Sequence, residues 1–101
     1  MTQDTMDAVI RIENYLESKF GAFADDLITE GYTIHRSSVQ YHAALMEFMY
    51  DAMEHIMVMM IDNPKGDDET TESYVGEMVD EYADTMMDDR IREILNEYFG
   101  E

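Results

Sequence analysis

Residues 37–62 decide the fold, and their sequence is SSVQYHAALMEFMYDAMEHIMVMMID. Ser37, with Gln40 three residues later, has the form of a capping box, in which each side chain satisfies a free backbone N–H at a helix start. Pro64 forbids continuation, because its ring removes a backbone donor and clashes with the preceding turn. The stretch therefore predicts one long helix over residues 37–62.

Two faces of this predicted helix are apolar. The first face has residues at seven-residue spacing and further apolar residues between them: Val39, Ala43, Met46, Tyr50, Met53, Met57 and Met60. The second face consists of Tyr41, Leu45, Phe48, Ala52 and Met59. A helix that is apolar over most of its circumference must be surrounded by other helices or by a second copy of the chain. We therefore expect a homodimer. The methionines could instead form an adaptable binding groove, although core or dimer interface is the commoner role of such a stripe.

Helical spacing continues on both sides of the central stretch. It predicts helices at residues 2–20 and 23–30, separated near Gly21, and a last helical region over residues 67–99 that begins at an Asp67 or Asp68 cap. Its apolar stripe drifts near Asp88 and Asp89, where a kink or break is expected. Asn63-Pro64-Lys65-Gly66 predicts a turn. The expected fold is all-α, a small bundle of three to four helices in a single domain, 1–101, with a long, mostly apolar central helix and a long acidic C-terminal helix.

The charge balance is extreme. The chain holds 24 Asp and Glu against 6 Lys and Arg, a formal net charge of -18. Self-repulsion on this scale opposes a compact state unless salt screens it or a positively charged partner neutralises it. Direct binding to nucleic acid or to an anionic membrane is therefore not expected. The partner that this charge predicts is a basic nucleic-acid-binding protein or complex.

The acids concentrate toward the C-terminus. Residues 67–89 contain ten acids and no base, and these are the candidate partner-binding residues: Asp67, Asp68, Glu69, Glu72, Glu77, Asp80, Glu81, Asp84, Asp88 and Asp89. As a helix, this segment would carry about one charge per 3.4 Å of axis, close to the phosphate spacing of one DNA strand. Five of them are related by steps of three or four residues and would form a row along one face of a helix: Glu77, Asp80, Glu81, Asp84 and Asp88. An ordinary solvated helix face is the competing interpretation.

No pattern indicates catalysis or a bound metal. Asp51 and His55 stand four residues apart and could hold a transition metal, but a hydrogen-bonded histidine on a core helix is commoner. Glu is absent three residues before every histidine, which excludes the di-iron pattern. The turn at Gly66 lacks calcium-ligand spacing, and no phosphate loop or nucleophile elbow occurs. With no cysteine, thiol chemistry is excluded. We expect a protein that is not an enzyme and that has no metal and no cofactor.

The charges near the N-terminus and the lengths of the apolar runs indicate where the protein is located in the cell. Asp4 and Asp7 stand where a secretory signal would need basic residues. The longest apolar run, residues 56–61, is far below the roughly 18 residues of a membrane helix. A cytoplasmic protein without a membrane span is expected.

The combination of short length, no cysteine, helical periodicity and extreme acidity resembles the phage-encoded acidic DNA mimics, which include the Ocr-like anti-restriction proteins and acidic anti-CRISPR proteins. The run Leu95-Asn96-Glu97-Tyr98 is similar to a stretch of Ocr. The resemblance implies a mode of action in the cytoplasm of a phage's host: carboxylates stand in for phosphates and block a defence or DNA-processing protein. It carries over no individual binding residue.

Two functional hypotheses follow. The first is an inhibitor that mimics nucleic-acid phosphate charge and blocks a DNA- or RNA-binding protein. The alternative is a structural or assembly protein, homo-oligomeric through its central helix, whose acidity serves solubility or adaptation to high salt.

Overall fold

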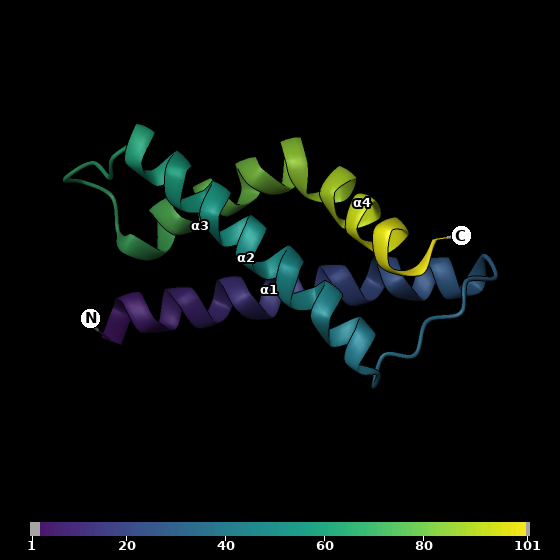
Figure 1. The fold of residues 1–101 in the computed structure, drawn as a ribbon. Coiled ribbons are helices and arrows are strands. Elements are labelled where there is room, and N and C mark those ends of the chain that lie inside the picture. The colour runs from purple at the N-terminus through teal and green to yellow at the C-terminus, as the bar shows by residue number, and fades with distance from the viewer. Residues whose placement is uncertain (1–2, 101) are drawn as a thin grey trace.

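The computed structural model describes residues 3–100, without the side chains of Asp4 and Thr5, and every regular element in this range is helical. The elements are α1 (Gln3–Thr29), α2 (Val39–Asp62), α3 (Thr71–Tyr82), the π-helical segment η1 (Ala83–Met87) and α4 (Asp88–Phe99). No break separates α3, η1 and α4, which together form one bent arm (Figure 1). The predicted all-α class is confirmed for the described residues. None of these helices combines the length and the apolar character needed to cross a bilayer.

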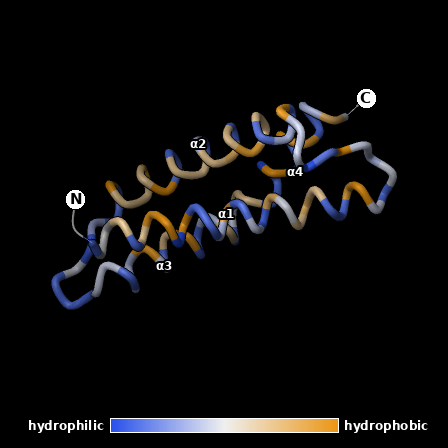
Figure 2. The backbone as a smooth tube through the Cα atoms, turned by 90° about the horizontal axis from the view of Figure 1, so that it is seen from below, coloured by the Kyte–Doolittle hydropathy of each residue, from blue (hydrophilic) through white to orange (hydrophobic). Residues whose placement is uncertain are grey.

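Helix α2 lies along one side of α1 and α3, and the end of α4 lies beside the end of α2 (Figure 2). The molecule is elongated, 49 × 25 × 18 Å. The core lies between α1, α2 and the arm and includes a stack of Phe20 on Phe48 with ring centroids 5.4 Å apart. Its largest fully buried side chains are Leu16, Phe20, Phe48, Ile56, Tyr82, Ile91, Ile94 and Leu95.

The predicted break near Gly21 is wrong, because α1 runs without interruption from Gln3 to Thr29. Gly21 is buried, and a Cβ atom there would lie against the guanidinium of Arg36. The glycine therefore provides room for a side chain of the following loop and does not end the helix. The end lies at Gly31, whose φ of 110° is in the left-handed region that glycine adopts readily. The predicted start at residue 2 lies outside the described residues.

Helix α2 begins two residues later than predicted. Its N-cap is Ser38, whose side chain accepts a hydrogen bond from the backbone N–H of Tyr41. Ser37 therefore does not form the predicted capping box. The end at Asp62, just before Pro64, agrees with the sequence. Of the two predicted apolar faces, the one that contains Tyr41, Leu45, Phe48 and Ala52 is buried.

The C-terminal arm begins at Thr71 and not at Asp67. Thr70 caps it by accepting a hydrogen bond from the backbone N–H of Ser73, so neither Asp67 nor Asp68 is the cap. The expected irregularity near Asp88 is found immediately before it, as the π-helical segment η1. A π turn holds more residues than an α turn, which moves the buried position from Met86 to Met87. The apolar stripe drifts in the sequence for this reason.

Candidate acidic interface

The structure divides the ten candidate acids between a turn and the arm. Asp67, Asp68 and Glu69 lie in the connection before α3, whereas the other seven are on α3, η1 and α4. The prediction of one continuous acidic helix from residue 67 is therefore wrong at its start, where the Asn63-Pro64 turn and the Thr70 cap delay the helix. Nine of the ten residues are exposed, and Glu69 is half-buried.

Three members of the predicted row lie near Tyr15 of helix α1. Asp80, Asp84 and Asp88 all lie close enough to Tyr15 to raise the pKa of its hydroxyl, after the larger effect of its burial. One of these carboxylates comes from α3, one from η1 and one from α4. Glu77 and Glu81 are exposed on α3. We call Asp80, Asp84 and Asp88, whose charges act on Tyr15, the band; the other two members of the predicted row, Glu77 and Glu81, lie on α3.

Basic side chains leave most of this acidic surface uncompensated. Within the described residues, Glu72 is the one candidate acid with an ion pair to a base, and its partner is Arg11 on α1. Arg36 pairs with Asp25, and Arg90 pairs with Asp51 and Glu93. Lys19 lies over the Tyr15 ring and Arg92 over the Phe23 ring, 5.7 and 5.5 Å from the centroids. Lys65 donates to the carbonyl of Gly66. All six bases therefore have contacts within the chain.

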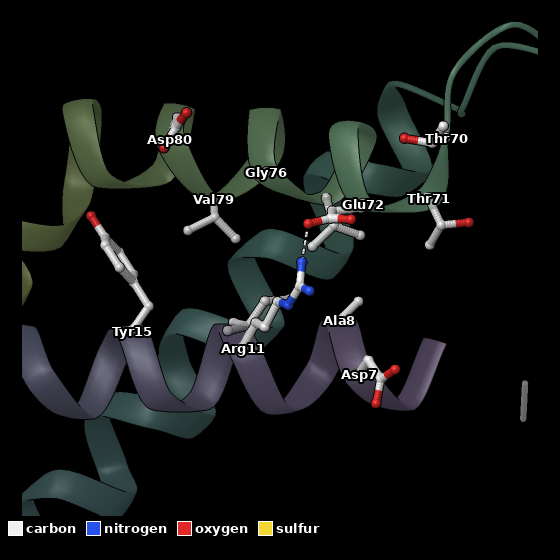
Figure 3. A pocket seen from close by; sticks show the side chains of 12 residues that line it. Asp7, Ala8, Arg11, Tyr15, Thr70, Thr71, Glu72, Gly76, Val79 and Asp80 are labelled. Carbon is white, nitrogen blue, oxygen red and sulfur yellow. Dashed lines mark hydrogen bonds and ion pairs between the residues drawn. The ribbon is translucent and has the colours of Figure 1, made fainter. Parts of the chain in front are cut away.

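A groove between α1 and α3 runs along this surface (Figure 3). Ala8, Ile12, Val75 and Val79 give it apolar lining, and the polar lining residues are Asp7, Arg11, Tyr15, Thr70, Thr71, Glu72 and Asp80. Arg11 extends across the groove to Glu72, so a guanidinium group already occupies it (Figure 3). Carboxylates beside an apolar surface suit arginine and lysine, which pack their carbon stems while their charged ends form ion pairs. This groove can therefore accept basic side chains.

No family model, curated protein or solved structure matches this chain. The functional argument therefore depends on the arrangement of its own residues.

A polar cluster at the α2–arm contact was only partly visible in the sequence. Asp51 Oδ2 accepts a hydrogen bond from Arg90 Nε at 3.0 Å and lies 3.8 Å from His55 Nε2. The His55 ring stacks on Tyr82, with centroids 6.2 Å apart. Sequence spacing found Asp51 and His55 because they share one helix, but Arg90 and Tyr82 come from the arm. Arginine takes the carboxylate that a metal would need, and no three potential metal ligands gather anywhere in the described residues.

Tyr82 is the buried member of this cluster. Its side chain is fully buried, and its hydroxyl has no hydrogen-bond partner in the described structure. Burial, together with the negative charge of Asp51, raises its pKa to about 12 although Arg90 acts in the opposite direction. Tyr82 therefore stays protonated and cannot supply a phenolate base near neutral pH.

Proposed function

We propose that the protein is an acidic inhibitor that occupies the nucleic-acid-binding site of a basic DNA- or RNA-binding protein. The observation that carries this proposal is the exposed acidic surface of the arm, where Glu72 alone among the ten candidates pairs with a base. Ordinary exposed helices intersperse lysine and arginine among their acids. The resemblance to phage-encoded DNA mimics suggests a host defence or DNA-processing protein as the target.

The groove between α1 and α3 supplies the chemistry of the contact. A partner's arginine would bind in this groove and could displace Arg11 from Glu72. The Asp80, Asp84 and Asp88 band beside it extends the negative surface along the arm. The net charge of -18 would also accelerate the encounter with a positively charged partner.

The first test identifies the target and asks whether it uses its nucleic-acid site. The protein is immobilised, native-host lysate is applied across a salt series, and the retained proteins are identified by mass spectrometry. We expect a basic nucleic-acid-binding protein that elutes with rising salt and that duplex DNA or RNA displaces. Retention of a target that neither nucleic acid displaces at low salt would contradict mimicry.

The second test separates a shaped acidic surface from total charge. In one variant, Glu77, Asp80, Glu81, Asp84 and Asp88 become Gln or Asn; in the matched control, Glu13, Glu17, Asp26, Glu30 and Glu97 are changed in the same way. All ten positions are exposed, and both variants lose five charges. Long-range attraction falls equally in the two, whereas close contacts to arginine and lysine are lost only in the first.

We expect the row variant to bind the target at least about tenfold more weakly than the control, a difference of about 1.4 kcal/mol. Calorimetry or surface plasmon resonance measures the two affinities, after circular dichroism has shown that both variants keep their helices. Equal affinities would sink the proposal that this row is a specific contact surface.

Exposed apolar side chains on α2 favour the alternative function, a homo-oligomeric assembly protein whose acids provide solubility or tolerance of high salt. Tyr50 is 71% exposed and Ile61 74% exposed. Such side chains are typical of protein–protein contacts when they form a continuous patch. A homo-oligomer without any salt-sensitive basic partner in the lysate experiment would favour assembly over mimicry.

A further inference from the structure

The outer face of α2 carries an unbroken apolar seam. We define the α2 seam as Val39, Ala43, Met46, Tyr50, Met53, Met57 and Met60. Five of these side chains are exposed, among them Met46 at 49% and Val39 at 86%, while Met53 and Met60 are half-buried. The buried face of α2, with Tyr41, Phe48 and Ala52, contacts the rest of the protein from the opposite side of the helix. The seam is therefore separate from the core.

The spacing of the seam is that of a coiled coil. Successive members are four and three residues apart, alternately, from Val39 to Met60, which is the spacing of the a and d positions of a heptad repeat. A surface helix that only packs on its own core needs one such stripe, and α2 has a second one on its buried face. An exposed a/d stripe fits against the same stripe of another helix, so a second copy of α2 is a matching partner.

Charge permits two strongly acidic chains to meet at this face. The Asp80, Asp84 and Asp88 band lies near Tyr15 of α1 and contains no member of the seam, which is entirely on α2. On α2 itself, Asp51 is compensated by Arg90. Only Glu47 and Glu54 flank the seam as acids, both at the e position, while the g positions hold His42, Met49 and Ile56. The contact surface is thus much less negative than the chain as a whole.

The flanking residues also select an orientation. In an antiparallel pair the e positions face each other, which would bring Glu47 of one copy next to Glu54 of the other on both sides of the symmetry axis. In a parallel pair an e position faces a g position, so Glu47 lies opposite His42 and Glu54 opposite Met49 of the second copy. Parallel pairing avoids every like-charge contact along the seam.

We propose that the protein is a homodimer in which the two α2 seams pack as a parallel coiled coil. This interface does not depend on the proposed inhibitory function, because it uses a different face of the molecule. The acidic arms of both copies remain exposed on the outside of the dimer.

The first experiment measures mass by light scattering at about 50 µM protein in physiological salt. Tyr50 and Met57 become Glu in one variant; in the matched control, Ile10 and Ile28, exposed apolar residues of α1, become Glu. We expect dimers for the wild type and the control, and monomers for the seam variant, whose helical circular dichroism stays unchanged because neither side chain is in the core. A monomeric wild type, or a seam variant that stays dimeric, would overturn the interface.

The second experiment determines the orientation and uses the absence of cysteine from the chain. Met46→Cys and Met57→Cys variants are oxidised separately and as a mixture, with Asn14→Cys, exposed on α1, as the control. In a parallel pair each seam position meets its own copy, so each single variant forms a disulfide-linked dimer. In an antiparallel pair position 46 meets position 57. Cross-linking that appears only in the mixture, or equally in the Asn14→Cys control, would overturn the parallel seam.

Discussion

At the scale of single residues, Tyr82 combines complete burial with an unsatisfied polar group. Its ring fills the core beside His55, yet its hydroxyl lacks a hydrogen-bond partner among the described residues. A buried hydroxyl without a partner loses its hydration and gains nothing in exchange. The hydroxyl, unlike the ring, therefore opposes folding.

The substitution Tyr82→Phe should raise the free energy of unfolding by up to about 1 kcal/mol at pH 7, because it removes this unsatisfied group and keeps the ring. Urea unfolding followed by circular dichroism measures the change. A loss of more than about 1 kcal/mol would show that the hydroxyl makes a stabilising contact.

The same variant tests the pH dependence. Folding raises the pKa of Tyr82 from 10.0 to about 12, so between these values the folded chain holds a proton that the unfolded chain has lost. Ionisation of Tyr82 therefore leaves stability unchanged below about pH 10 and lowers it as pH rises toward 12, because the unfolded chain loses its proton first. Wild-type stability should fall more steeply than that of Tyr82→Phe over this interval. Parallel curves would contradict the raised pKa.

At the scale of helices, the sequence predicted the kind of the main segments but not all of their limits, since the predicted helices 2–20 and 23–30 are one helix, α1. Pro64 placed the end of α2 correctly, because proline acts through its own covalent geometry. The predictions made from Gly21 and Ser37 were wrong for different reasons. The role of Gly21 depends on a residue in the loop after the helix, and Ser37 competes with its neighbour Ser38 for the capping position. Gly21 accommodates Arg36, and Ser38 provides the cap that was assigned to Ser37. Local chemistry alone does not encode such contacts.

In the candidate site, too, the sequence predicted some features and not others. Composition was sufficient to select the ten acids, and nine of them are exposed. Helical spacing could not show that Asp80, Asp84 and Asp88 lie near Tyr15, because these residues are on different elements. Nor could it show that Arg11 pairs with Glu72, which is 61 residues away. The surface was visible in the sequence, whereas the groove was not.

The π segment provides an element-scale prediction. Buried positions before η1 continue as Val75, Val79 and Tyr82, and after it as Met87 and Ile91, one residue later than an uninterrupted α-helix would place them. Deletion of the exposed Thr85 should therefore restore a continuous α-helix with the same core, and stability should stay within about 1 kcal/mol of the wild type.

A deletion in regular helix is the control for this experiment. Removing Glu93 rotates Ile94 and Leu95 away from the core, which should cost at least about 3 kcal/mol. Urea unfolding compares the two deletions. Equal losses would mean that the π turn itself is required and does not simply accommodate one extra residue.

At the scale of the whole molecule, repulsion among the acids should limit stability. Raising salt from about 0.1 to 1 M shortens the Debye length from about 10 to about 3 Å, which screens exposed carboxylates from one another. We expect the Tm to rise by at least about 4 °C at constant protein concentration, the equivalent of about 1 kcal/mol. Differential scanning calorimetry measures this change.

The variant with Gln or Asn at Glu77, Asp80, Glu81, Asp84 and Asp88 should show a smaller rise, because it has fewer charges to screen. A Tm that falls with salt in the wild type would show that its few ion pairs outweigh the repulsion.

All six basic side chains contact groups of their own chain, and this affects the thermodynamics of binding to a partner. Because no base compensates most of the outer acids, dissolved cations must gather around them, as they do around nucleic acids. A partner that approaches with lysine and arginine displaces these cations into the solvent. Their regained translational freedom is then a major driving force for binding, so complex formation would be favoured by entropy and would need little enthalpy from the contacts themselves.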